Sequence, residues 1–264
     1  MKLISHNGKL WAMIVALLWL CACGPPTGTL KWPGHPGGRC LASSPYELKD
    51  IEANRRATFR IDIQPGGHGS GVVISRQGHL ATAYHVVDDA KGLSITMVEP
   101  GGRLKTYPAQ VVAVDKRHDL AIIKIERLFP RAPRLASMDR VRPGDAVYNI
   151  GYPHDFGELI SRGYVMRLRW SHNFESGSRV DRCLLVDIKN GPGTSGSGVF
   201  SSNSGEIVGL LVMKVWVKST RAPATVVHVV VPANYLRDLM KQVSPVRPSL
   251  PSRPPLLKSP PPPR

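Results

Sequence analysis

The sequence is poor in cysteine, in clustered positive charge and in long hydrophobic runs. It has four cysteines in 264 residues, and outside the first 24 residues none of them has a CxxC or Cys/His spacing of the kind that binds zinc. No run of five or six consecutive basic residues occurs, which argues against a nucleic-acid-binding arm. The sequence therefore predicts no metal ion or other cofactor, and it gives no support to a nucleic-acid partner.

Acidic residues are also few, 19 against 35 lysines and arginines, so that the formal net charge is +16. The basic residues are spread along the chain and no basic-aromatic motif accompanies them. A solvated basic surface explains this pattern better than a nucleic-acid site does. The electrostatic field of such a surface would attract anionic membrane or cell-wall surfaces.

The longest apolar run covers residues 10–22 and follows two lysines. It is short for a membrane span and has the length of the hydrophobic region of a secretory signal. We expect residues 1–23 to be an export signal, with an uncleaved anchor as the alternative. The segment Leu20-Cys21-Ala22-Cys23-Gly24 resembles a bacterial lipobox, which implies lipidation of Cys23. The protein is thus expected to be exported, as a periplasmic, lipid-anchored or secreted protein.

Two cysteines, Cys40 and Cys183, remain when the signal is removed. In an exported chain they would be able to form one disulfide. The apolar neighbours of Cys183 are equally compatible with a buried free thiol. The sequence leaves both alternatives open.

Short apolar runs dominate the middle of the chain. They are rich in valine and isoleucine, are separated by Gly/Pro turns, and form two blocks at about residues 55–127 and 142–231. Residues 232–243 change to a helical spacing of apolar residues. We predict an all-β fold of two six-stranded antiparallel β-barrels followed by a C-terminal helix.

Proline and glycine mark the two ends of this region. Residues 24–54 are rich in both and are expected to be a linker with little structure of its own. Residues 244–264 have no hydrophobic period and contain repeated prolines and basic residues, which predicts a disordered or polyproline-like tail. The folded part is therefore expected within residues 55–240.

A glycine-rich turn, Gly191-Pro192-Gly193-Thr194-Ser195-Gly196-Ser197-Gly198-Val199, leads into an apolar strand. A serine hydroxyl is a good nucleophile only when a base removes its proton, so a nucleophilic Ser195 requires a histidine and a carboxylate elsewhere. Glycines permit backbone angles that aim N–H groups at one point, and the N–H groups of Gly193 and Ser195 are the candidates for an oxyanion hole. A flexible surface loop would have the same composition.

His85 is the candidate base and Asp119 the candidate carboxylate. His85 ends a β-type run and Asp119 immediately precedes one. Each has a plain structural explanation, a half-buried histidine at a strand end and an acidic turn residue. Together they lie in the first strand block and Ser195 lies in the second, so a cleft between two barrels would bring all three together.

Three segments resemble the signature blocks of chymotrypsin-fold serine peptidases, in the same His, Asp, Ser order. They are Thr82-Ala83-Tyr84-His85, Asp119-Leu120-Ala121-Ile122-Ile123-Lys124 and Gly193-Thr194-Ser195-Gly196-Ser197. The similarity is greatest to the bacterial HtrA/Deg-type and glutamyl-endopeptidase-like branch and covers roughly residues 57–240. It implies a serine endopeptidase that cleaves polypeptides through an acyl-enzyme intermediate. No PDZ-like module is expected after the peptidase region.

The resemblance also implies where a substrate side chain would bind. The specificity pocket would be formed by residues 187–192 and the strand near residues 210–213, with Lys189 near its floor and Leu210, Leu211 and Val212 along its wall. A lysine there argues against Arg or Lys at the P1 position of the substrate and leaves acidic or small apolar residues open. The alternative to an enzyme is a catalytically silent protein of the same fold that binds anionic polymers or a partner through its basic surface.

Overall fold

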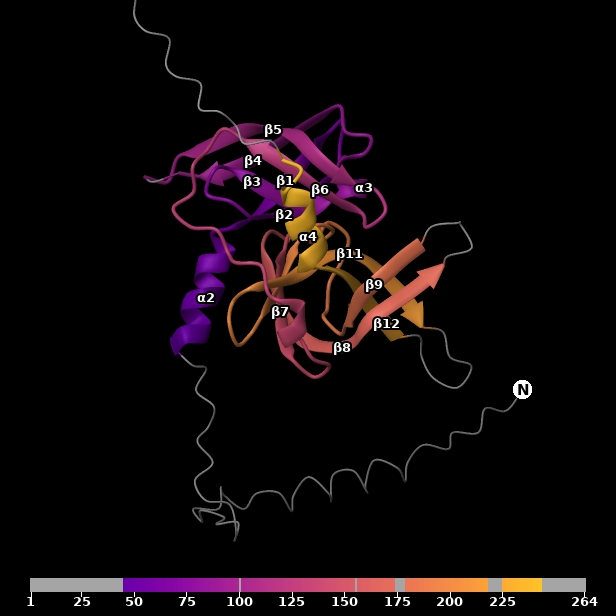
Figure 1. The fold of residues 1–264 in the computed structure, drawn as a ribbon. Coiled ribbons are helices and arrows are strands. Elements are labelled where there is room, and N and C mark those ends of the chain that lie inside the picture. The colour runs from indigo at the N-terminus through magenta and orange to yellow at the C-terminus, as the bar shows by residue number, and fades with distance from the viewer. Residues whose placement is uncertain (1–44, 100, 155, 174–178, 218–224, 244–264) are drawn as a thin grey trace, which may run out of the picture. The chain divides into compact units, whose positions relative to one another are not determined.

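The fold was analysed in a computed structural model, which describes residues 45–99, 101–154, 156–173, 179–217 and 225–243 (Figure 1). The predicted export signal, Cys23, Cys40 and the predicted tail lie outside these residues. No helix in the described part of the chain is both long enough and apolar enough to cross a membrane.

The first barrel is closed, with the strand order β1-β2-β3-β6-β5-β4 and antiparallel pairing throughout. Its strands are β1 (Thr58–Gln64), β2 (His68–Val73), β3 (His79–Ala83), β4 (Gly92–Val98), β5 (Leu104–Asp115) and β6 (Leu120–Ile125). One short helix, α3 (Tyr84–Val87), follows β3 directly.

The second barrel is also closed, with the order β10-β11-β12-β9-β8-β7. Its strands are β7 (Ala146–Gly151), β8 (Leu159–Asn173), β9 (Arg179–Val186), β10 (Gly198–Ser201), β11 (Ile207–Val217) and β12 (Thr225–Pro232). The 3₁₀ helix η1 (Met138–Arg140) precedes it and α4 (Ala233–Met240) follows it. The predicted fold of two six-stranded antiparallel barrels and a terminal helix is confirmed.

The apolar core is continuous between the barrels. Ile61 and Ile122 of the first barrel and Phe200 and Leu210 of the second are fully buried in one cluster. Burying such side chains is worth about 1.5–3 kcal/mol each, which favours a fixed junction. β1 lies against β7 and β3 lies against β11.

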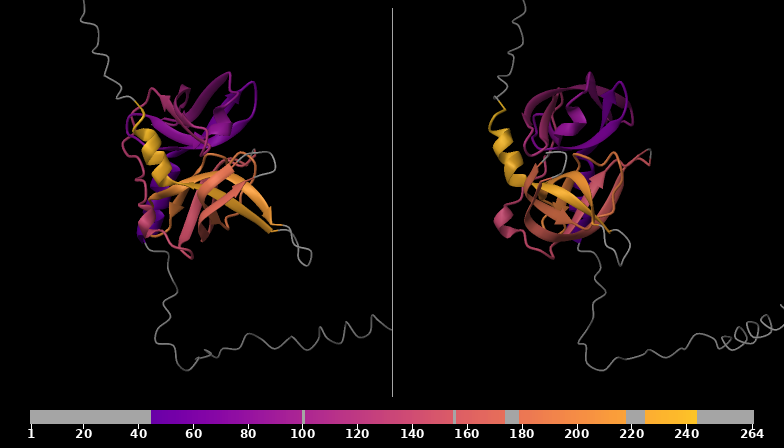
Figure 2. Two further views of the ribbon diagram at one scale, coloured as in Figure 1. Left: turned by 45° about the vertical axis from the view of Figure 1, so that its right-hand side comes forward. Right: turned by 90° about the vertical axis from the view of Figure 1, so that its right-hand side faces the viewer.

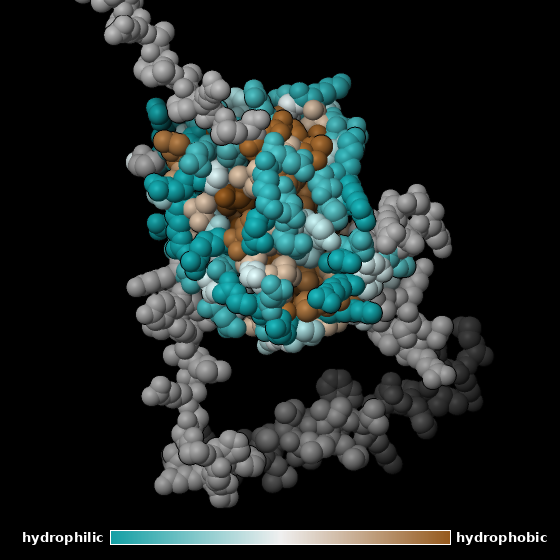
Figure 3. Space-filling model, in the orientation of Figure 1, coloured by the Kyte–Doolittle hydropathy of each residue, from teal (hydrophilic) through white to brown (hydrophobic). Residues whose placement is uncertain are grey.

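Helix α4 runs along one side of the junction, as Figures 1 and 2 show. It contacts β5 and β6 of the first barrel and β11 and β12 of the second. Leu236 and Leu239 are buried on the face toward the barrels, as the helical spacing requires. Hydrophilic residues cover most of the face seen in Figure 3, and smaller hydrophobic areas lie between them near α4.

The linker predicted over residues 24–54 does not extend to its predicted end. Helix α2 (Pro45–Arg55) occupies its last part, because Pro45 suits the first turn of a helix and residues 46–55 contain neither glycine nor proline. The buried Asn54 Nδ2 donates to the Tyr148 hydroxyl and to the Gly205 carbonyl oxygen, both at 2.8 Å. These bonds attach α2 to the second barrel.

Candidate active site

His85 and Asp119 form a hydrogen-bonded pair within the first barrel. Strands β3 and β6 are neighbours, and Ala83 pairs with Leu120, so the residues that follow β3 and precede β6 meet at the same end of the sheet. His85 Nδ1 lies 2.7 Å from Asp119 Oδ2, and the His85 backbone N–H donates to Asp119 Oδ1 at 2.8 Å. The Tyr84 N–H donates to the Asp119 carbonyl oxygen at 3.0 Å.

This pair fixes both the proton position and the basicity of the imidazole. An ionised carboxylate only accepts hydrogen bonds, so Nδ1 is the donor and Nε2 of a neutral His85 is left as an acceptor. The hydrogen bond to Asp119 raises the pKa of His85 above its ordinary value, while partial burial acts in the opposite direction. The imidazole is therefore a base whose charged form is stabilised.

Asp119 holds this position in an unusual backbone conformation. Its φ angle is 54°, in the left-handed region that aspartate tolerates better than most non-glycine residues. Both carboxylate oxygens face His85, one toward the backbone and one toward the ring. The strained turn thus places the carboxylate where it can bind the histidine at two points.

The turn that contains Ser195 is fixed between the two barrels. The Gly196 N–H donates to the Leu211 carbonyl oxygen on β11 at 2.7 Å, and the Ser195 carbonyl oxygen accepts from the Ser70 N–H on β2 at 2.9 Å. Gly196 has a φ of +84°, and a Cβ there would collide with Thr82 Oγ1 and the Ser70 carbonyl oxygen. The turn therefore lies directly against β2 and β3. Its contact on β3, Thr82, precedes His85 by three residues in the chain.

Ser70 is a positioning residue that the sequence analysis did not single out. Its hydroxyl is completely buried at the junction, donates to the Gly193 carbonyl oxygen at 2.8 Å and accepts from the Tyr152 N–H at 3.0 Å. It therefore orients the peptide group before Thr194. The available signal was a small polar residue between two glycines inside an apolar strand.

Two backbone donors of the turn have no acceptor. Among the described residues, neither the N–H of Gly193 nor that of Ser195 donates a hydrogen bond. Backbone N–H groups are normally paired when they are not exposed to solvent or ligand. The two N–H groups that the sequence proposed for an oxyanion hole are thus available to an external acceptor.

Ser195 and His85 line adjacent cavities. His85 and Asp119 border a cavity of about 580 Å³, and Ser195 borders one of about 310 Å³. Both cavities are also lined by Val212 and Met213 of β11. The described residues include no hydrogen bond between the Ser195 hydroxyl and the His85 ring, and such bonds often form fully only with substrate present.

The smaller cavity corrects part of the predicted specificity pocket. Leu211 and Val212 line it, whereas Leu210 is fully buried in the core. The pairing of β11 with β12 is irregular between Leu211 and Met213, so the residues after Leu210 do not follow strict alternation and Leu211 and Val212 both reach the cavity. The Lys189 side chain is exposed to solvent, so it does not form a floor of this cavity.

Two polar residues line the same cavity: Asn190, which lies within the predicted segment 187–192, and His228, which the sequence analysis did not include. His228 on β12 and Asn190 both line it, and His228 Nδ1 and Asn190 Nδ2 are buried without a hydrogen-bond partner in the described part of the chain. His228 interrupts the apolar run Val226-Val227-His228-Val229-Val230, which was the available signal. Burial, and then the nearby Lys214, lower the pKa of His228, so the ring is neutral near pH 7.

Cys183 is a buried free thiol among the described residues. Burial raises its pKa to about 12, which makes it unreactive. Because Cys40 lies outside the described residues, the pairing of Cys40 with Cys183 stays a prediction.

The two closed barrels, with a His–Asp pair on one and a glycine-bounded serine turn on the other, define the chymotrypsin-like class of fold. Residues 69–210 match the family model described as a trypsin-like peptidase domain. This match covers more than half of the sequence, and the chain belongs to the trypsin-like peptidase family.

Proteases named as Deg or HtrA proteins are among those similar to this chain. The chain is 31% identical over 165 residues to chloroplastic Protease Do-like 1 of Arabidopsis thaliana, covering 60% of this chain and 36% of that protein. It is 34% identical over 147 residues to the periplasmic serine endoprotease DegP of Salmonella typhimurium, covering 54% and 29%. The chain thus spans about a third of the length of these relatives.

Solved structures show the same fold. Deg5 superposes with a TM-score of 0.58 at 21% identity, covering 72% of this chain and 90% of that one. The HtrA-type protease AlgW with a tripeptide superposes with a TM-score of 0.62 at 22% identity, covering 75% and 63%.

Proposed function

We propose that the protein is a serine endopeptidase with the catalytic triad His85, Asp119 and Ser195. One observation carries the proposal: the 2.7 Å bond between His85 Nδ1 and Asp119 Oδ2 lies beside a serine turn that has two unpaired N–H donors. A base oriented by a carboxylate, a nucleophile and an anion-stabilising pair of donors are the parts that acyl transfer requires.

The mechanism follows from these positions. His85 Nε2 accepts the Ser195 proton as Oγ attacks the scissile carbonyl carbon, and Asp119 stabilises the imidazolium that forms. The N–H groups of Gly193 and Ser195 bind the resulting oxyanion. His85 then protonates the leaving amine, which departs and leaves the acyl group bound to Ser195 Oγ. Water that gives a proton to His85 attacks this ester, and the acid product is released as Ser195 regains its proton from His85.

The cavity beside Ser195 favours a P1 side chain that accepts hydrogen bonds. The buried, unpartnered nitrogens of His228 and Asn190 would each gain a bond to a carboxylate or amide oxygen, and leaving them unpaired costs about 1–3 kcal/mol each. Lys214 also lines this cavity and favours a negative charge. Between the two classes left open by the sequence, the polar lining supports acidic P1 residues over small apolar ones.

A peptide-library digest tests this preference. We expect cleavage after Glu or Asp to exceed cleavage after Ala by at least about tenfold, the effect of one or two unpaired polar groups. Preference for Arg, or equal cleavage after Ala and Glu, would contradict it.

An active-site fluorophosphonate tests the nucleophile itself. We expect wild-type protein to be labelled at Ser195, and labelling to be lost in His85→Ala, because the serine then lacks its base. Ser202→Ala, which changes a serine in the turn that follows β10, is the matched control and should label as wild type does. A catalytically silent protein of this fold would label in none of them.

We also propose that the protein is exported to the periplasm, the compartment that the name of the Salmonella relative gives for that protein. The support from this chain is the apolar run at residues 10–22. Intact-mass analysis of the cell-envelope fraction should find a chain that begins at Cys23 with a lipid adduct, or one cleaved nearby. A full-length chain in the cytoplasm would contradict export.

A further inference from the structure

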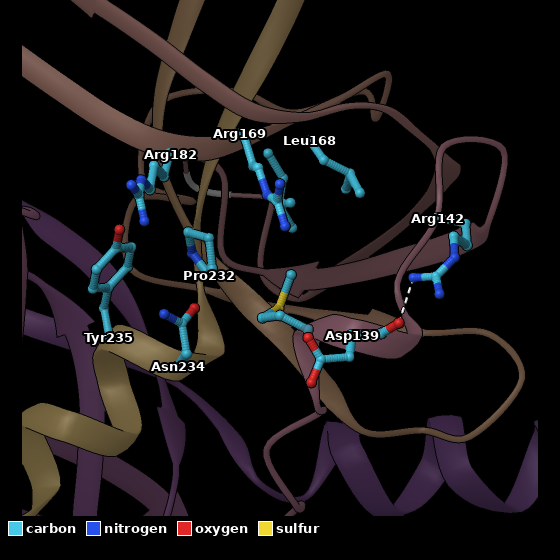
Figure 4. A pocket seen from close by; sticks show the side chains of 10 residues that line it. Asp139, Arg142, Leu168, Arg169, Arg182, Pro232, Asn234 and Tyr235 are labelled. Atoms are coloured by element: carbon cyan, nitrogen blue, oxygen red, sulfur yellow. Dashed lines mark hydrogen bonds between the residues drawn. The ribbon is translucent and has the colours of Figure 1, made fainter.

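A third cavity, of about 560 Å³, lies beside the second barrel and shares no lining residue with the candidate active site. It is open to solvent and is bordered by η1, by β8 and β9, and by the junction of β12 with α4 (Figure 4). Three arginines line it: Arg142, Arg169 and Arg182. Asp139 is the one acidic side chain among its described lining residues.

Two of these arginines occupy left-handed backbone positions. Arg169 on β8 has a φ of 54° and Arg182 on β9 has a φ of 48°. The pairing of β8 with β9 shifts register on either side of Trp170, first by an extra residue on β8 and then by an extra residue on β9. Such β-bulges redirect side chains, and non-glycine residues adopt this φ only at an energetic cost. Both bulges direct a guanidinium group to the same cavity.

Among the described residues, no side chain pairs with the guanidinium group of Arg169 or of Arg182. No ion pair joins a carboxylate of the described residues to either group, and both side chains are exposed to solvent. Arg142 instead donates to the carbonyl oxygens of Asp139 and Val141. In Figure 4, Arg182 lies above the Tyr235 hydroxyl and Arg169 points into the space between the strands and α4. Both groups are therefore free to bind an anion that enters the cavity from solvent.

The N-terminus of α4 adds positive potential to the same cavity. Pro232 is the N-cap and Asn234 and Tyr235 lie in the first turn, and all three line the cavity. Pro232 supplies no side-chain cap and the first turn contains no acidic residue. The first N–H groups of a helix lack intrahelical acceptors and attract anions. The helix end and the two arginines thus converge on one space.

We propose that this cavity binds the phosphate group of a small phosphomonoester through Arg169, Arg182 and the N-terminus of α4. A phosphate presents oxygens in several directions and suits donors that converge from two strands and a helix, whereas a carboxylate has only two oxygens. The volume exceeds that of a free phosphate ion and lies in the range of small-molecule sites. The apolar residues Leu168 and Leu184 also line the cavity and would contact the organic group of a phosphomonoester.

One ring joins this cavity to the candidate active site. Tyr235 lines the cavity and stacks on His118 with ring centroids 3.9 Å apart. His118 directly precedes Asp119 in the chain, and its Nδ1 is hydrogen-bonded to Asp115 Oδ2 at 2.6 Å. Any effect of phosphate on peptide hydrolysis would pass through this contact, and that effect rests on the proposed function. The binding of phosphate itself is independent of the proposed function.

Calorimetric titration of the full chain at constant ionic strength tests the binding. Inorganic phosphate, glycerol 3-phosphate and phosphatidylglycerol vesicles distinguish a free ion, a soluble phosphomonoester and a lipid headgroup. We expect glycerol 3-phosphate to bind most tightly, and Arg169→Gln and Arg182→Gln each to weaken it at least tenfold. Arg103→Gln removes the same charge from an exposed turn of the first barrel and should bind as wild type does. Equal weakening in all three variants, binding of vesicles alone, or no binding by wild type would overturn the proposal.

Arg169→Gly separates a binding role from a structural one. Glycine adopts the left-handed φ without cost, so we expect the Tm of the unliganded variant to equal or exceed that of wild type. The increase in Tm that glycerol 3-phosphate gives the wild type should be lost. A lower unliganded Tm with the ligand effect retained would show that Arg169 serves the fold and would overturn its assignment to the site.

Discussion

The two sides of the cleft are built differently. On the first barrel, His85 and Asp119 are joined by side-chain and backbone hydrogen bonds within one sheet. On the second barrel, the Ser195 turn keeps two N–H groups unpaired and depends on β2 of the other barrel for its position. The acid-base half is thus complete within its barrel, whereas the nucleophile half depends on the junction. Substitutions on the two sides should therefore fail in different ways.

The largest effect is expected for Ser195→Ala, which removes the nucleophile. We expect kcat/KM for a peptide substrate to fall by about 10⁴- to 10⁶-fold, the range usual for the serine of such triads. Tm should be unchanged, because the hydroxyl donates no hydrogen bond among the described residues.

Ser197→Ala is the control for that prediction. Ser197 Oγ is buried and accepts from Asn149 Nδ2 at 2.8 Å, so this variant should lose stability by about 1–3 kcal/mol and keep most of its activity. If Ser197→Ala abolished hydrolysis and Ser195→Ala did not, the nucleophile would be Ser197.

Asp119→Asn tests the His85–Asp119 pair of the first barrel. We expect kcat to fall by about 10⁴-fold, because an amide donor favours the wrong tautomer of the imidazole. The bond to Asp119 raises the pKa of His85, and only the neutral ring is a base. The wild-type rate should therefore fall as the pH drops through this raised pKa. In Asp119→Asn the inflection of kcat/KM against pH should move to lower pH. An inflection that does not move would show that another group controls the profile.

The same contrast explains how much of the site could be predicted from the sequence. The strand blocks, the terminal helix and the residues His85, Asp119 and Ser195 depend on local patterns and on chain order, which a sequence contains. Lys189 and Leu210 do not line the cavity beside Ser195, because the direction of a side chain on β11 or after β9 depends on register and bulges. Their effect appears only after the barrel has closed.

Residues whose role depends on distant partners were also missed. Ser70 is separated from Gly193 by more than a hundred positions, and only the closed junction brings the two together. Arg169 and Arg182 carry no motif, because the left-handed φ that directs them is a property of bulges in two paired strands. Helix α2 lacked an amphipathic signal because Ile51 and Asn54 are the buried residues among its described side chains, and one of these is polar.

Gly196→Ala tests the second-barrel side with a smaller effect. The new Cβ would collide with Thr82 Oγ1 and the Ser70 carbonyl oxygen and push the turn away from β3. We expect kcat/KM to fall by about 10²-fold, the scale of losing one oxyanion donor. Gly102→Ala is the matched control, since it has a similar φ of +81° and no atom within 4 Å of its Cβ. Both variants should lose about 1 kcal/mol through backbone strain, and an equal loss of activity would contradict the role of the contact.

Ser70→Ala should have the smallest effect and separates the two barrels most sharply. The change leaves the Gly193 carbonyl oxygen and the Tyr152 N–H without their shared partner, which costs about 1–3 kcal/mol of stability. Because the peptide before Thr194 is then less firmly oriented, we expect kcat to fall about tenfold with little change in KM. Thr82→Val removes a buried bond to the Ser70 carbonyl oxygen and is the control, with a similar loss of Tm and an unchanged kcat. If both variants lowered kcat equally, the junction would act only through overall stability and Ser70 would not position the oxyanion donor.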